Sequence, residues 1–84
     1  SVCTDGVAWF QAKGKWQSGG SVPTPGTIIF FDWDHDGASD HVGIVESCDG
    51  TTVHTIEGNS GDAVKQNNYT VNSQSILGYG LVAY

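Results

Sequence analysis

The chain has 84 residues, of which 38% are hydrophobic and 14% charged, and its formal net charge at pH 7 is −6. This length suits one domain with a small core, and the composition is too apolar for a disordered chain. Its only cationic side chains besides histidine are three lysines. Proteins that bind nucleic acid through phosphates need more such cations, so the composition argues against nucleic-acid binding. No apolar run approaches the ~18 residues of a membrane span, which argues against membrane insertion.

The first predicted element is one short helix over residues 1–14. Thr4 or Asp5 can cap its start, and Gly14 is a natural stop. The stretch from residue 15 to residue 26 is rich in Gly, Ser and Pro, which is typical of a connector. The chain is therefore predicted to reach its first strand only after residue 26.

The remaining predicted elements are antiparallel strands. Residues 27–33 are β-branched and aromatic with an unbroken apolar middle, which fits a strand buried on both faces. The other predicted strands cover residues 41–47, 51–57 and 76–84, with a short one at 69–71 inside a polar, Asn-rich stretch. Together with the helix, they predict a single α+β domain with a sheet of four to six antiparallel strands.

Four aspartates fall within nine residues: Asp32, Asp34, Asp36 and Asp40. Carboxylates at positions 1, 3, 5 and 9 with glycine at position 6 are the spacing with which a loop wraps a calcium ion. Position 12 of that spacing is a bidentate glutamate, but here it is Gly43. The sequence leaves two interpretations open: a calcium site, and a solvated loop in which Asp and Gly only make the turn.

His41 begins one predicted strand, and Glu57 and Asn59 end the next. Glu57 and Asn59 are two residues apart, so they face the same side of an extended chain. A three-residue turn at residues 48–50 would place His41 directly opposite Glu57, whereas a two-residue turn would place Val42 there. A His–Glu pair is the orienting half of a nucleophile–base–orienter triad. The alternative is a surface cross-strand pair that contributes little to stability.

Three stretches closely resemble the CHAP domain: PGTIIFFDWDHDGASDHVGIVES, TVHTIEGNSGDAV and ILGYG. CHAP domains are cysteine, histidine-dependent amidohydrolases/peptidases, a branch of the NlpC/P60 and papain-like thiol hydrolases. The resemblance covers about residues 22–82 and implies a papain-like fold in one domain over residues 1–84. It implies a secreted enzyme that acts on bacterial peptidoglycan in the cell wall. The expected targets are stem-peptide or cross-bridge amide bonds, or the N-acetylmuramoyl–L-alanine bond, and no cofactor is required.

The resemblance also implies roles for individual residues. A cysteine at a helix N-terminus is the nucleophile, His41 is the base, Glu57 orients His41, and Asn59 completes the polar site. Cys3 lies only 38 positions before His41, closer than the nucleophile of the family, and its surroundings resemble the family's later connecting segment. We therefore expect the nucleophilic helix to lie outside this segment. Cys3 is the other candidate, because it stands at a helix start.

Two other function classes stay open on the sequence: a non-catalytic extracellular module that binds the cell wall, and a small calcium-binding module built on the aspartate loop. Cys3 and Cys48 could form a disulfide or remain two free thiols. Loss of the nucleophilic helix would expose apolar sheet surface, and such surface predicts a homodimer.

Overall fold

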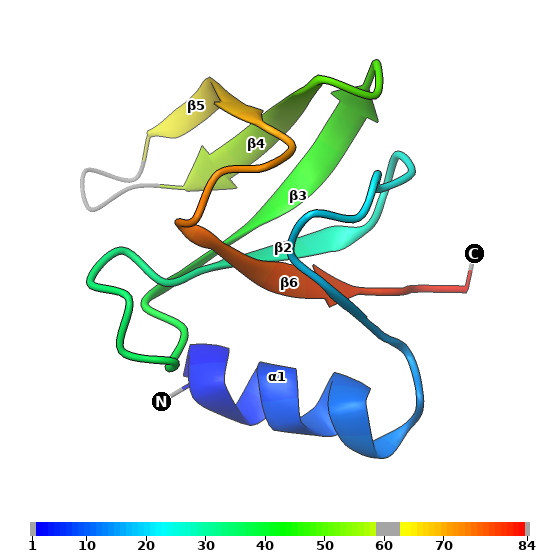
Figure 1. Ribbon diagram of the computed structural model, residues 1–84, viewed down its shortest axis with the longest axis vertical. Coiled ribbons are helices and arrows are strands. Elements are labelled where there is room, and N and C mark those ends of the chain that lie inside the picture. Colours follow the sequence, from blue (N-terminus) through cyan, green and yellow to red (C-terminus); the bar gives the residue numbers. More distant parts are fainter. Residues whose placement is uncertain (1, 59–62, 84) are drawn as a thin grey trace.

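The computed structural model describes residues 2–58 and 63–83 of the chain. Over these residues the chain forms one helix and six strands (Figure 1). Their bounds are α1 Val2–Ala12, β1 Trp16–Ser18, β2 Ile28–Phe31, β3 His41–Cys48, β4 Thr52–Gly58, β5 Val64–Thr70 and β6 Ile76–Gly80. The predicted α+β class, with the helix before the strands, is confirmed.

The strands form one antiparallel sheet in the order β1-β6-β2-β3-β4-β5. β6 lies between β1 and β2, so the last strand of the chain closes one half of the sheet. The consecutive strands β3, β4 and β5 form the other half, which extends away from the helix in Figure 1. The sheet therefore has two halves. The helix packs on the half that contains β6 and β2, and the other half consists of three strands that are consecutive in the chain.

Helix α1 starts at Val2, so the predicted caps Thr4 and Asp5 lie in its first turn instead of before it. An acidic side chain is favourable there because the first turn carries the positive end of the helix dipole. Gly14 ends the helical segment as predicted, with a φ of 69° that closes the last turn in the left-handed conformation. The helix has 11 residues, too few to cross a bilayer, and the described part of the chain contains no longer apolar helix.

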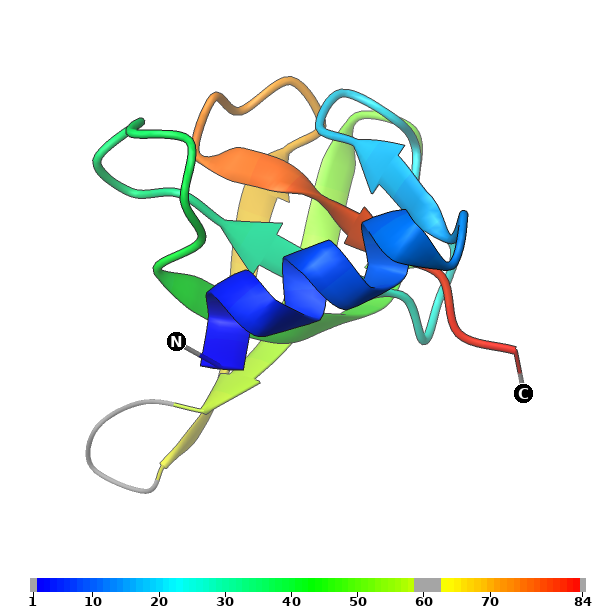
Figure 2. The same ribbon diagram turned by 90° about the horizontal axis from the view of Figure 1, so that it is seen from below.

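Helix α1 lies against the face of the sheet formed by β2 and β6 (Figure 2). The ring of Phe10 packs against Phe30 with 5.9 Å between centroids, and Trp16 packs against Phe30 at 5.6 Å. Phe10 also lies directly over Gly80, where an added Cβ would come within 2.4 Å of its ring. The absence of a side chain at position 80 is what lets the helix approach the sheet this closely.

Strand β2 is buried on both faces, as its unbroken apolar run predicts. Phe30 faces the helix, whereas Ile29 and Phe31 face the opposite side of the sheet and are fully buried. There they join the main core, which consists of Ile29, Phe31, Val45, Val53, Val71, Ile76 and Tyr79. Adjacent positions of one strand thus contribute to the packing on both sides of the sheet.

Two strands differ most from the sequence prediction. β1 lies inside the stretch that was predicted as a connector, and β5 is much longer than the short strand predicted at residues 69–71. Both are edge strands, and most positions of β5 are exposed. β1 has only three residues, too few to show an alternating pattern, and the exposed β5 carries no apolar alternation that would predict a strand.

Candidate active site

His41 and Glu57 form a hydrogen-bonded pair, with His41 at the start of β3 and Glu57 near the end of β4. His41 Nε2 lies 2.8 Å from Glu57 Oε1. Only 6% of the Glu57 side chain is exposed, against 28% of the His41 side chain. Because an ionised carboxylate can only accept, the neutral ring donates its Nε2–H and keeps the lone pair on Nδ1. The pair has the arrangement of a base and the group that orients it.

The β3–β4 hairpin has a register that the sequence does not predict. Val45 is opposite Thr55, and Ser47 is opposite His54, so Glu46 is an extra residue that forms a bulge in β3. Both turn lengths considered from the sequence are wrong, because Cys48 pairs with Val53 and four residues, 49–52, lie between them. The bulge then shifts the register by one further residue. A bulge depends on local backbone geometry that apolar alternation does not encode.

Gly43 lies opposite Glu57 in this register, and its missing side chain lets the pair form. The Glu57 side chain passes over Gly43, where an added Cβ would lie 2.7 Å from Glu57 Cγ. His41 is two residues away from Gly43 on the same face of the strand. The predicted direct opposition of His41 and Glu57 is thus wrong, and their side chains meet diagonally across the glycine.

Two hydroxyl groups bind the other carboxylate oxygen of Glu57. Thr55 Oγ1 donates to Glu57 Oε2 at 2.6 Å, and Tyr69 Oη donates to the same oxygen at 2.8 Å. Burial alone would raise the pKa of Glu57, but the hydrogen bonds from Thr55, Tyr69 and His41 outweigh it and hold this pKa below its ordinary value. Burial and the bond to the Glu57 charge raise the pKa of Tyr69, so the phenol stays protonated and remains a donor.

Aromatic rings surround the inner side of His41. Phe31 and Trp33 stack with 4.6 Å between centroids and 14° between planes. The His41 ring lies 5.7 Å from Phe31 and 5.9 Å from Trp33, and Tyr69 lies 4.8 Å from Phe31. Phe31 is fully buried, whereas Trp33 is 44% exposed. Trp33 therefore presents an aromatic surface to solvent beside the exposed part of His41.

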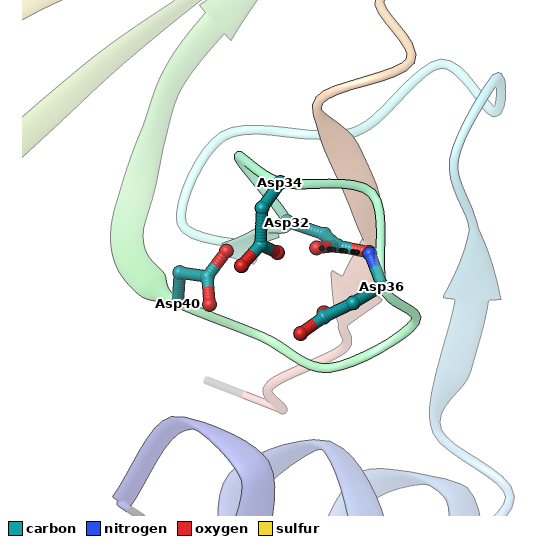
Figure 3. A group of neighbouring side chains, drawn as sticks. All are labelled: Asp32, Asp34, Asp36 and Asp40. Carbon is teal, nitrogen blue, oxygen red and sulfur yellow. Dashed lines mark hydrogen bonds between the residues drawn. The ribbon is translucent and has the colours of Figure 1, made fainter.

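The four aspartates between β2 and β3 converge as their spacing predicts (Figure 3). One carboxylate oxygen from each lies within 4.8 Å of the others, the residues being Asp32, Asp34, Asp36 and Asp40. Oxygen ligands lie about 2.3–2.6 Å from a calcium ion, so two ligands of one ion are at most about 5 Å apart. The donor set and its spacing therefore fit one calcium ion.

Hydrogen bonds within the aspartate loop close it immediately before His41. Gly37 N–H donates to Asp32 Oδ2 at 2.7 Å, so Asp32 also makes the turn that the alternative interpretation assigns to it. Trp33 N–H donates to Asp40 Oδ2 at 2.8 Å and closes the loop immediately before His41. The second of these bonds holds the backbone of Trp33 beside Asp40, the residue that precedes His41.

The charges of the loop are not independent. Partial desolvation, a hydrogen bond with Asp32 and repulsion from Asp36 and Asp40 raise the pKa of Asp34 to about 6. Desolvation would also raise the pKa of Asp32, but hydrogen bonds from the backbone of Gly37 and Asp36 lower it. A bound cation would relieve the repulsion that acts on Asp34.

Neither cysteine is hydrogen-bonded to His41 or Glu57 among the described residues. Cys3 lies in the first turn of α1, which packs against the face of β2 opposite the core, whereas the His41 ring lies on the core side beside Phe31. Cys48 packs against the main core. Both are free thiols, so the Cys3–Cys48 disulfide is not formed in this fold, where the two residues are on opposite faces of the sheet.

Three residues of this site are not predicted from the sequence: Gly43, Thr55 and Tyr69. Thr55 carried a usable signal, because it stands two residues before Glu57 and shares its strand face. Tyr69 could not be placed without the β4–β5 pairing, and Gly43 was noted only as a departure from the calcium spacing. The predicted site residue Asn59 lies outside the described residues.

The arrangement of the His41–Glu57 pair can be compared with that of known protein families. The CHAP domain matches the chain over residues 2–59, a segment that runs from α1 through β4 and includes the aspartate loop. The chain belongs to the CHAP family. CHAP domains are in general amidase and peptidase modules, so membership indicates, at the level of class, an enzyme of the peptidoglycan-hydrolase type.

A solved structure shares the fold of this CHAP domain. The crystal structure of Ly7917 superposes with a TM-score of 0.57 at 32% sequence identity. The similarity covers 83% of this chain and 32% of that chain, so the chain spans about a third of the length of Ly7917. The curated proteins contain no match to the chain.

Proposed function

We propose that this CHAP domain hydrolyses amide bonds of bacterial peptidoglycan by a thiol mechanism, with His41 as the base and Glu57 as its orienter. The observation that carries the proposal is the 2.8 Å bond from His41 Nε2 to Glu57 Oε1, which leaves Nδ1 of a partly exposed ring as the basic atom. A papain-like arrangement and secretion to the cell wall are part of the same proposal. They are supported by family membership and by the single antiparallel sheet.

In this mechanism Nδ1 takes the proton of a cysteine thiol, and the thiolate attacks the amide carbonyl. The protonated ring then donates the same proton to the leaving amine, which produces an acyl-enzyme. Water, activated by Nδ1, hydrolyses the acyl group and regenerates the thiol. Throughout, the Glu57 carboxylate keeps the ring in the required tautomer and stabilises its protonated form. Asn59 would complete the polar site, as the family resemblance implies.

We place the nucleophilic cysteine in a segment that precedes this one rather than at Cys3. Cys3 belongs to the helix on the opposite face of β2 from His41, and both aromatic contacts of His41 lie on the core side. Cys48 is also a poor nucleophile, because it packs against the core. A helix N-terminus facing the exposed part of His41 would supply the thiol and lower its pKa.

The test is release of soluble fragments from purified peptidoglycan, identified by mass spectrometry. It compares the 84-residue chain with a version extended by the preceding residues of its reading frame. We expect the extended protein to be active, and His41→Ala to lower the rate by roughly 10²–10⁴-fold, the range for general acid–base catalysis. His54→Ala is the matched control, because His54 bonds Asn68 away from Glu57.

Three outcomes would contradict parts of this proposal. Activity that survives His41→Ala would refute the assigned base. Activity of the 84-residue chain that Cys3→Ser abolishes would make Cys3 the nucleophile. Binding to purified cell wall without fragment release from either protein would favour the non-catalytic binding module.

We also propose that the aspartate loop binds calcium as a structural ion beside the active site. Calcium that binds only the folded chain should raise the free energy of unfolding by roughly 2.7 kcal/mol at a hundred times its Kd. Asp34→Asn should remove most of this gain, whereas Asp5→Asn, in α1, should keep it. Thermal unfolding with calcium, magnesium or chelator provides the measurement. An equal shift with magnesium, or no effect of Asp34→Asn, would overturn the assignment.

A further inference from the structure

We infer that Thr55 and Tyr69 are positioning residues that hold the Glu57 carboxylate toward His41, an inference that rests on the proposed function. Both hydroxyl groups donate to Oε2, at 2.6 and 2.8 Å, and His41 occupies Oε1. Each carboxylate oxygen thus has its own partners, and a rotation of the group that exchanged the two oxygens would break all three bonds.

The two donors reach Oε2 from different strands. Thr55 is on β4, two residues before Glu57 on the same face, and Tyr69 is on β5. A single donor would leave the carboxylate free to pivot about one bond, whereas two donors from separate strands fix both its direction and its plane. Hydrogen bonds to an ionised acceptor are short and strong, which the two distances reflect.

Solvent cannot easily replace these donors. Thr55 is fully buried, and Glu57 is 5% exposed. The Tyr69 ring packs 4.8 Å from the buried Phe31, which limits its movement. If one donor is removed, a buried carboxylate oxygen is left without a hydrogen bond, which is destabilising. We expect the carboxylate then to rotate toward water and away from His41.

Tyr69 lies outside the segment that the CHAP family matches, which ends at residue 59. Its assignment therefore comes from the geometry of the β4–β5 pairing. With Thr55 and Tyr69, the orienting part of the site grows from a pair of residues to four, which lie on three consecutive strands.

The test reads the tautomer of His41 by ¹⁵N NMR of the imidazole rings, recorded at about pH 8.5, where an ordinary imidazole is neutral. The 84-residue chain should show His41 predominantly as the Nε2–H tautomer. In Tyr69→Phe and Thr55→Val, the ratio of the Nε2–H to the Nδ1–H form should fall by about threefold to tenfold, the range expected for one lost hydrogen bond. The double variant should lose more of the preference than either single variant.

Two matched variants separate positioning from packing. Thr55→Ser retains the hydroxyl and should restore the wild-type tautomer ratio. Tyr79→Phe removes a buried phenol oxygen that has no hydrogen-bond partner among the described residues, and it should leave His41 unchanged. The signals of the exposed His35 report any global change in each variant.

The outcomes are separable from those of the hydrolysis test. Unchanged His41 signals in both Tyr69→Phe and Thr55→Val, or a failure of Thr55→Ser to restore them, would refute the positioning role even if the enzyme is active. Absence of hydrolysis with the expected tautomer changes would refute the proposed function and leave the geometry intact. In an active protein, the two variants should lower kcat and leave KM nearly unchanged.

Discussion

At position 43 the site depends on the absence of a side chain. In Gly43→Ala the new Cβ would stand 2.7 Å from Glu57 Cγ and 3.2 Å from the Ile56 carbonyl oxygen. We expect Glu57 to be displaced and its bond to His41 to weaken. The free energy of unfolding should fall by about 1–3 kcal/mol, as for other overpacked sites. Urea unfolding measures the loss, and the His41 tautomer reports the displacement.

Gly58 offers the matched control for this substitution, because it is the neighbour of Glu57 along β4. An added Cβ there meets nothing within 4 Å. Gly58→Ala should therefore unfold at the same urea concentration as the wild type or a higher one, since alanine restricts the unfolded chain more than glycine does. Equal stability of the two alanine variants would show that position 43 is not crowded.

The lowered pKa of Glu57 makes stability depend on pH with a definite sign. Its folded-state pKa lies below the ordinary value of 4.5, so the unfolded chain binds the proton more tightly. The contribution of Glu57 is therefore complete above the unfolded value and is lost as pH falls through the folded pKa. Urea unfolding between pH 7 and pH 3 should show a shallower loss in Glu57→Gln than in the wild type.

A residual pH dependence is expected in Glu57→Gln, because hydrogen bonds also lower the pKa of Asp32 and Asp49. The difference between the two curves isolates Glu57. Curves that run parallel from pH 7 to pH 3 would mean that the carboxylate gains nothing from its three donors.

At the scale of elements, α1 is attached to the sheet largely through aromatic contacts. Phe10 packs against Phe30 and covers Gly80. Phe10→Ala should lower the free energy of unfolding by about 2–4 kcal/mol, near the lower end for buried phenylalanine because Phe10 is only partly buried. Gln11→Ala, on an exposed neighbouring position, should change it by less than about 0.5 kcal/mol. Similar losses in both variants would contradict this view of the attachment.

Sequence reasoning located the elements whose side chains are buried. The apolar run of β2 and the Gly14 stop of α1 are correctly predicted. A buried strand requires apolar residues, and a left-handed residue at a helix end is usually glycine. β1 and most of β5 show no such sequence pattern. An edge strand is held by backbone hydrogen bonds, which form whether the side chains are polar or apolar.

The central pair of the candidate site was predictable from the sequence, but its geometry and three of the surrounding residues were not. His41 and Glu57 stand at strand positions that the sequence places near each other, and the CHAP resemblance gives them roles. The bulge at Glu46 shifts the register of the hairpin. The side chains of His41 and Glu57 then meet diagonally, because Gly43 has no side chain between them. The contribution of Tyr69 required the pairing of a strand that the sequence pattern largely conceals.

At the scale of the whole molecule, part of the sheet beyond α1 carries exposed apolar side chains. Ile44 is 46% exposed and Val64 is 75% exposed. They line a shallow apolar groove together with Ile28, Val42 and Ile56. Exposed apolar surface favours association, so we expect this chain to form a homodimer through the groove as its concentration rises.

Sedimentation equilibrium over a range of concentrations tests this expectation. Ile44→Lys should shift the chain toward the monomer, whereas Val22→Lys, at an exposed apolar position outside the groove, should not. A monomer at every concentration would show that the exposed groove does not drive association of this chain.

The placement of the orienting groups on β3, β4 and β5 has a consequence for the order of folding. His41, Thr55, Glu57 and Tyr69 all lie on strands that are consecutive in the chain and paired with their neighbours. Pairing consecutive strands requires less loop closure than joining α1 to β6 from opposite ends of the sequence. We expect this meander to form first, and its amide hydrogens to stay protected from exchange during fluctuations that detach the helix. The base and its orienting groups would then persist in partly opened states of the molecule.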